Sequence, residues 1–183
     1  VLAYLRLATN PQDSLSFERV VNSPKRGIGA TSMQKLQDFA DFHGISLEEA
    51  AENVALTEIK GKAVNELQKF AHLIRKLHDL EEKENVTELT EDILEMTGYR
   101  AELEKTKSLE NQSRLENLDE FLTVTKQFDA QWQPEDEESD PFADFLADLA
   151  LVSDQDDVDD SNEVTLMTLH AAKGLEFPVV FLM

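Results

Sequence analysis

Apolar residues recur at helical spacing along most of the 183-residue chain. The clearest stretch is residues 62–80, with apolar side chains at Val64, Leu67, Phe70, Ala71, Leu73, Ile74 and Leu77. Steps of three and four residues place these side chains on one face of a helix, which must be buried against another element. The pattern predicts a mostly α fold in which amphipathic helices share a core.

Turn and cap residues divide the rest of the chain into further predicted helices. One stops near Asn10-Pro11, the next starts after Asp13 or Ser14, and later ones cover 87–96, 109–128 and 142–151. Two capping-box spacings mark other helix starts, Thr31 with Gln34 and Ser46 with Glu49. Glycines at 44 and 98 should end helices.

Charge is distributed unevenly over the chain, whose net charge is −21. Residues 1–78 hold ten Lys or Arg and nine Asp or Glu, whereas residues 79–163 hold six and 28. This balance argues against nucleic-acid binding over the whole surface, but it leaves room for a local cationic face in the first segment. The acidic part is expected to be a solvated surface with flexible stretches at 134–141 and 153–163.

The pattern becomes β-like only after residue 163. We therefore expect a helical domain over 1–152, an acidic linker over 153–163 and a piece of a sheet-containing domain over 164–183. The chain opens on Val within an amphipathic pattern, so we expect a piece of a longer protein. It has no cysteine for disulfides or thiolate metal sites and no run of about 18 to 20 apolar residues for a membrane helix, which fits a cytoplasmic protein.

The first candidate site is the turn Arg26-Gly27-Ile28-Gly29-Ala30-Thr31, with Lys25 beside it. Two glycines permit positive φ and close backbone approach, and the following helix start offers N–H groups and a positive dipole end. Such a turn can hold a phosphate without reading a base. The plain alternative is a helix-to-helix turn anchored by a buried Ile28.

A similar element recurs at Lys60-Gly61-Lys62, again directly before a helix. Two such turns in the part of the chain that is not acidic suggest contacts with successive phosphates of a duplex. A structural turn remains the plain alternative here as well.

A third candidate is Thr97-Gly98-Tyr99-Arg100, followed by Arg114 and Asn117 on one helix face. A helix-ending glycine, a core tyrosine and a local salt bridge of Arg114 are the alternatives. The histidines at 43, 72 and 78 are expected to face solvent.

The last motif spans Thr168 to Phe177, where a strand-like run meets a polar, glycine-bearing loop. Polar side chains at the end of a strand in an α/β domain lie where ligands bind. Four different polar groups are offered by Thr168, His170, Lys173 and Glu176. A metal site is a weak alternative, because only His170 and Glu176 could be ligands.

Three stretches resemble superfamily-one DNA helicases of the UvrD/PcrA/Rep type. TLHAAKGLEFPVVFL resembles motif V of these helicases, YLRLATNPQDSLSFERVVNSPKRGIGATS the opening of their 2B subdomain, and RLENLDEFLTVTKQF a later 2B helix. The resemblance implies a helical 2B insertion followed by part of the RecA-like motor domain 2A. It covers nearly the whole chain in the family's order.

The resemblance also implies roles for individual residues. Thr168, His170 and Lys173 would contact single-stranded DNA, while Glu176 and Gly174 would lie at the ATP site. Duplex DNA would be contacted by Lys25, Arg26, Gly27, Ile28, Gly29, Thr31, Lys60, Gly61, Lys62, Thr97, Gly98, Tyr99, Arg100 and Arg114.

The parent protein implied by this resemblance is an ATP-dependent 3′-to-5′ DNA helicase of repair or replication that uses ATP and Mg²⁺. Its partners would be a DNA junction, the rest of the motor and accessory proteins. The chain lacks the phosphate-binding pattern GxxxxGK[ST], so we expect it to bind no cofactor and to catalyse nothing alone. The alternative is a helical module that docks other proteins through its acidic face.

Overall fold

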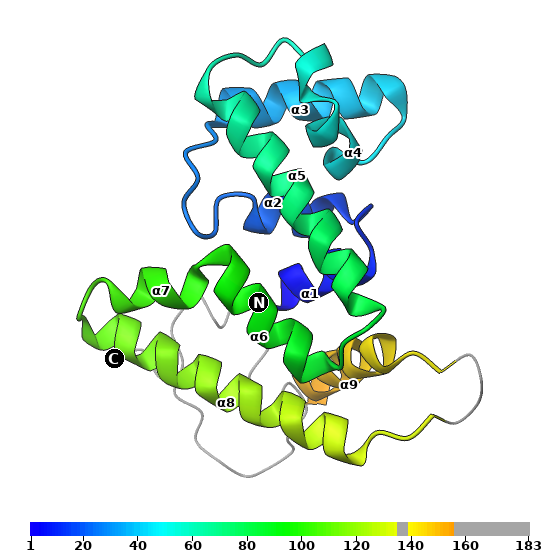
Figure 1. The fold of residues 1–183 in the computed structure, drawn as a ribbon, viewed down its shortest axis with the longest axis vertical. Coiled ribbons are helices and arrows are strands. Elements are labelled where there is room, and N and C mark those ends of the chain that lie inside the picture. The colour runs from blue at the N-terminus through cyan, green and yellow to red at the C-terminus, as the bar shows by residue number, and fades with distance from the viewer. Residues whose placement is uncertain (135–138, 156–183) are drawn as a thin grey trace, which may run out of the picture. The chain divides into compact units, whose positions relative to one another are not determined.

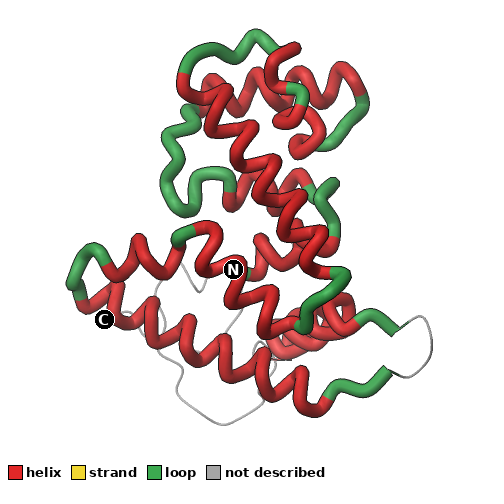
Figure 2. The backbone as a smooth tube through the Cα atoms, in the orientation of Figure 1, coloured by secondary structure: helices red, strands yellow, loops and turns green. Residues whose placement is uncertain are grey.

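The computed structural model describes residues 1–134 and 139–155, and these residues contain helices and no strand. The elements (Figures 1 and 2) are α1 Leu2–Thr9, α2 Ser14–Val20, α3 Ala30–His43, α4 Leu47–Glu52, the 3₁₀ helix η1 Val54–Leu56, α5 Lys62–Glu81, α6 Val86–Thr97, α7 Tyr99–Glu104, α8 Leu109–Gln131 and α9 Pro141–Gln155. The predicted mostly α fold is confirmed.

Helix α5 lies at the centre of the helical unit, which comprises Val1–Ala150. In Figure 1 it runs from the side of α3 and α4 towards α1 and α6, and it packs against α1, α4 and α6. The apolar stripe predicted for this helix is confirmed: Leu67, Phe70, Ala71, Ile74 and Leu77 are all buried. These side chains meet apolar residues from α1 to α4 and from α9 in one main core.

A smaller apolar cluster joins α6, α7 and α8 through Leu94, Leu103 and Leu118. Helix α7 follows α6 directly, because Gly98 adopts φ 71° and ψ 18° and so ends one helix while it starts the next. The sequence pattern did not predict α7, since six residues are too short to show a helical period.

Side-chain caps define several helix starts. Asp13, Ser46, Asn85 and Ser108 each accept a hydrogen bond from a backbone N–H in the first turn of α2, α4, α6 and α8. The predicted cap at Ser46 is confirmed. The predicted cap at Thr31 is wrong, because Gly29 occupies the N-cap position in extended conformation and Thr31 already lies inside α3.

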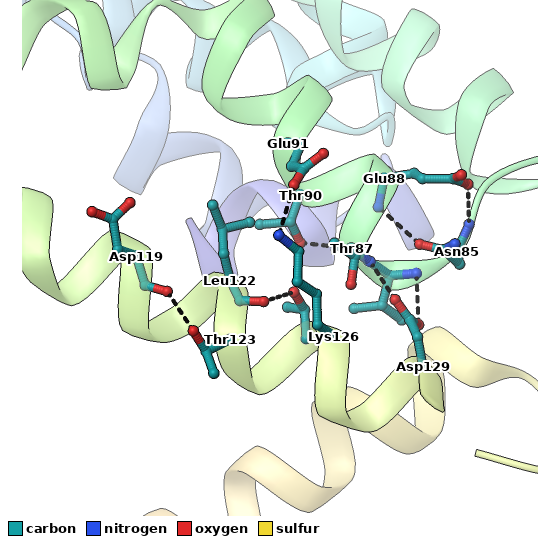
Figure 3. A network of polar contacts seen from close by, with 12 residues as sticks. Asn85, Thr87, Glu88, Thr90, Glu91, Asp119, Leu122, Thr123, Lys126 and Asp129 are labelled. Atoms are coloured by element: carbon teal, nitrogen blue, oxygen red, sulfur yellow. Dashed lines mark hydrogen bonds and ion pairs between the residues drawn. The ribbon is translucent and has the colours of Figure 1, made fainter. Parts of the chain in front are cut away.

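Helix α6 has a second cap that comes from α8 (Figure 3). The Asp129 carboxylate accepts hydrogen bonds from the backbone N–H groups of Val86 at 3.2 Å and Thr87 at 2.9 Å. The reciprocal capping box of Asn85 and Glu88 satisfies further N–H groups at this helix start. Two segments more than 40 residues apart are thereby joined at one helix end.

Other boundaries differ from those predicted. Helix α9 continues to Gln155, so residues 153–155 of the predicted linker are helical. His78 was expected to face solvent, but it is half-buried, and its Nδ1 lies 2.6 Å from the carbonyl oxygen of Ala8 in α1. The rest of the linker and the segment 164–183 lie outside the described residues. In the described part of the chain, no helix is both long enough and apolar enough to cross a membrane.

Candidate nucleic-acid interface

The loop between α2 and α3 carries the first glycine turn, and Asn22 closes it. The Asn22 amide donates to the Ile28 carbonyl at 2.7 Å, and the Ile28 N–H donates to the Asn22 side-chain oxygen at 3.1 Å. The Ile28 side chain is buried in the main core. The N–H and carbonyl of Ile28 are thus engaged and its side chain is buried, which favours the anchor alternative for this residue.

Arg26 also turns towards the protein. Its Nη1 donates to the carbonyls of Val20 at 3.0 Å, Val21 at 3.1 Å and Pro24 at 3.3 Å, and its Nη2 donates to the Tyr4 hydroxyl at 2.9 Å. The guanidinium carbon lies 4.6 Å from the centre of the Phe70 ring, a cation–π distance. This geometry gives Arg26 a structural role that the sequence did not indicate and leaves it poorly placed for the predicted phosphate contact.

The two glycines of this turn differ in conformation. Gly27 has a φ of 77°, which favours glycine, whereas Gly29 has φ −76° and ψ 160°, which any residue adopts. A Cβ atom built on Gly29 would meet nothing within 4 Å. Neither backbone conformation nor packing within the described residues therefore requires a glycine at position 29.

The start of α3 is open. Gly29, Ala30 and Thr31 are exposed, and α3 has no side-chain cap. Lys25 is exposed beside it and forms no ion pair with any described residue. The predicted residues Lys25, Gly29 and Thr31 thus lie together at an accessible helix start with a positive dipole end.

The second glycine turn has the same features. Gly61 occupies the N-cap position of α5 with φ 74° and ψ −145°, a region open almost only to glycine, and α5 also lacks a side-chain cap. Lys60 and Lys62 on either side are exposed, without an ion-pair partner among the described residues. The Lys35 ammonium donates to the Glu58 carbonyl at 3.2 Å, which ties α3 to the segment that leads into this turn.

The third candidate segment is occupied by contacts within the chain. The Thr97 hydroxyl donates to the Ile93 carbonyl at 2.6 Å, and Tyr99 packs against the smaller apolar cluster. Arg100 pairs with Asp119 of α8, and Arg114 pairs with Glu110 at 2.6 Å. These contacts favour the structural alternative for Thr97, Gly98, Tyr99, Arg100 and Arg114.

Thr168, His170, Lys173, Gly174 and Glu176 lie outside the described residues. Among the residues that are described, no group of three or more His, Cys, Asp or Glu side chains could hold a metal ion. Sequence reasoning missed Tyr4, Asn22 and Phe70, which shape the first turn. Tyr4 and Asn22 lay only within the stretch of family resemblance, and the helical spacing placed Phe70 in the apolar stripe of 62–80 without linking it to this turn.

Comparison with known proteins identifies the family of this chain. A family model, the UvrD-like helicase C-terminal domain, matches residues 1–183. The chain is 49% identical to the ATP-dependent DNA helicase PcrA of Bacillus subtilis (strain 168) over 190 residues and 51% identical to that of Leuconostoc citreum over 185. The PcrA helicase of Staphylococcus epidermidis is 42% identical over 183 residues.

Each alignment covers the whole of this chain and 25% of the relative. The chain therefore spans about a quarter of the length of these curated relatives. It belongs to the family of the UvrD-like helicase C-terminal domain, which confirms the resemblance found in its motifs.

Proposed function

We propose that this chain is the part of an ATP-dependent 3′-to-5′ DNA helicase that contacts the backbone of duplex DNA. The observation that carries the proposal is the pair of glycine turns before α3 and α5. Both helices begin without a side-chain cap and beside exposed lysines, whereas α2, α4, α6 and α8 have side-chain caps. Backbone N–H groups left without an acceptor at a helix start suit a phosphate oxygen.

Gly29 strengthens the proposal. Since neither its conformation nor its packing requires glycine, a close approach from outside the chain explains the residue best. The duplex surface that we propose comprises Lys25, Gly27, Gly29, Thr31, Lys60, Gly61 and Lys62. Arg26 and Ile28 are left out of it because their polar groups are engaged within the chain.

The remaining assignments rest on the family. The helical part, residues 1–152, would correspond to the 2B subdomain, 153–163 to a linker and 164–183 to the portion of domain 2A with motif V. There Thr168, His170 and Lys173 would contact single-stranded DNA, and Gly174 and Glu176 would lie at the ATP site of the full-length motor. ATP and Mg²⁺ would serve that motor, whose partners would be a DNA junction and accessory proteins.

The test is a salt titration of a fluorescent duplex with the wild-type chain and three variants. The wild type should bind without sequence preference, with a dissociation constant on the order of 10⁻⁴ to 10⁻⁶ M. Lys25→Ala should lower the slope of log K against log salt by about 0.9, which corresponds to one lost phosphate contact. Gly29→Asp should abolish binding, because it brings a side chain and a negative charge to the phosphate position.

Gly29→Ser is the matched control for charge. Ser and Asp are both favoured N-cap residues, so neither variant should lower the melting temperature. Gly29→Ser should weaken binding less than Gly29→Asp does. Equal affinity and equal slope in all four proteins would remove the duplex role from this turn and favour docking of a protein partner through the acidic face.

A further inference from the structure

The loop before α3 is held by a clamp of three side chains, two of which come from outside the loop. The clamp consists of Arg26, the Tyr4 hydroxyl from α1 and the Phe70 ring from α5. It draws on two helices, one of them about 40 residues further along the chain. Such a convergence fixes the conformation of a loop that would otherwise be free to adopt others.

The clamp uses backbone carbonyl groups. Arg26 donates to the carbonyls of Val20, Val21 and Pro24. The Tyr4 hydroxyl accepts from Arg26 and donates to the Ser23 carbonyl at 2.7 Å. Four carbonyl oxygens of residues 20–24 are thus directed at two side chains of the chain itself.

The hydroxyl of Tyr4 keeps its proton in this setting. Burial raises the pKa of Tyr4, and the opposing effect of the Arg26 guanidinium does not reverse this rise. A neutral phenol can donate to Ser23 and accept from Arg26 at the same time. The clamp therefore stays intact through neutral pH.

The end of the loop, at the start of α3, presents N–H groups. Gly29, Ala30 and Thr31 are exposed, and their N–H groups have no acceptor among the described residues. A phosphate that approaches this turn would meet positive partial charges, while neighbouring carbonyl oxygens that would repel it are held inward by Arg26 and Tyr4.

We infer that Arg26 is a positioning residue for duplex binding: held by Tyr4 and Phe70, it keeps the carbonyls of Val20, Val21 and Pro24 turned inward and the N–H groups at the start of α3 available to a phosphate. The inference rests on the proposed function of this turn. In this role Arg26 does not contact DNA itself. Its guanidinium holds the conformation of the loop, and the loop contacts the DNA.

The salt dependence of binding separates these two roles. Arg26→Ala should weaken duplex binding about tenfold, since the loop must be ordered at the moment of binding. The slope of log K against log salt should stay at the wild-type value, because no phosphate contact is lost. A slope lower by about 0.9 would show that Arg26 touches a phosphate and would overturn the inference.

Two milder variants keep the test valid if Arg26→Ala unfolds. Arg26→Lys keeps the charge but cannot fork towards the carbonyls and the hydroxyl, so it should also weaken binding. Tyr4→Phe removes one oxygen and keeps the ring in the core, and it should cause a smaller loss. Arg19→Ala is the matched control, because it removes an exposed arginine next to the same loop and should leave affinity and slope unchanged.

Amide hydrogen exchange of the loop tests the clamp without DNA. In Arg26→Ala the N–H of Ile28 should exchange about tenfold faster than in the wild type, while amides of α8 should not change. Wild-type affinity together with unchanged exchange in Arg26→Ala and Arg26→Lys would overturn the inference. If the wild type itself shows no salt-dependent binding, the proposed function fails and the DNA role of Arg26 with it. Faster exchange would then still demonstrate the clamp.

Discussion

Arg26 and Gly29 lie three residues apart, yet the structure gives them opposite environments. The guanidinium of Arg26 is engaged by backbone carbonyls and Tyr4, whereas Gly29 has open space where a side chain would lie. A basic residue beside a glycine turn thus need not face a ligand. A glycine in extended conformation can be the better indication of a binding site, when neither its conformation nor its packing requires glycine. Contacts decide between these roles, and residue type does not.

Glu48 is a residue whose environment predicts a measurable pH effect. Its side chain is only 8% exposed, and burial together with the nearby Glu52 carboxylate raises its pKa to about 7, although Arg75 opposes the rise. A raised pKa in the folded state means that the stabilisation is complete below the unfolded pKa near 4.5. It is lost as the pH rises through 7.

Glu48→Gln should therefore raise the free energy of unfolding at pH 8, by at most about 3 kcal/mol, and change it little at pH 4.5. The measurement is urea unfolding followed by circular dichroism between pH 4.5 and pH 8. Glu49→Gln is the control, because Glu49 is exposed on the same helix. An equal pH dependence in wild type and Glu48→Gln would contradict the prediction.

At the scale of elements, the start of α6 contrasts with the starts of α3 and α5. Helix α6 is fully capped by Asn85 and Asp129, and this cap fixes it to α8 (Figure 3). Lys126 of α8 also pairs with Glu91 of α6 at 3.4 Å. Helices α3 and α5, in contrast, keep open starts at exposed glycine turns. The cap between α6 and α8 is structural, whereas the open starts of α3 and α5 are the parts that we propose contact DNA.

Asp129→Ala should destabilise the chain by about 1 to 2 kcal/mol, since it leaves two N–H groups at the start of α6 without their charged acceptor. Asp129→Asn keeps one acceptor oxygen, so its stability should lie between those of the wild type and Asp129→Ala. Chemical denaturation measures the loss, and faster amide exchange at Val86 and Thr87 locates it. Glu120→Ala, an exposed residue of the same helix, should have little effect. Similar losses in the two alanine variants would show that the cap contributes nothing specific.

At the scale of the whole molecule, the unequal charge opposes the compact state. Residues 79–163 hold 28 acidic and six basic side chains, and four of those basic residues form ion pairs: Arg100, Lys105, Arg114 and Lys126. Among the described residues, one buried oxygen of Glu84 has no hydrogen-bond partner, and burial, with Asp92 and Glu88 nearby, raises the pKa of that residue. Repulsion among carboxylates is therefore part of the folded state.

Raising NaCl from 0.02 to 0.2 M should raise the melting temperature, because the screening length falls to about 8 Å or less at the upper end. One cooperative transition is expected in circular dichroism, because α1 to α6 and α9 share one core. The same salt should weaken duplex binding, so stability and affinity should move in opposite directions. A melting temperature that stays constant or falls over this range would show that carboxylate repulsion is negligible.

The amino-acid sequence by itself determined most of the helices, part of their capping and the family. The stripe of α5, the cap at Ser46 and the helix ends at Gly44 and Gly98 follow from contacts within a few residues, and such local contacts are readable as spacing. The stretches 4–32, 114–128 and 168–182 carried the resemblance because each is contiguous in the chain.

Only the tertiary structure decided what the side chains at the turns do. Arg26 meets Tyr4 and Phe70, and Asp129 meets Val86, across separations of about 20 to more than 40 residues. No local pattern records such pairs, since they depend on how the helices pack. Gly29, and not Thr31, takes the N-cap position of α3, and Arg26 and Ile28 have partners within the fold that their residue types did not indicate.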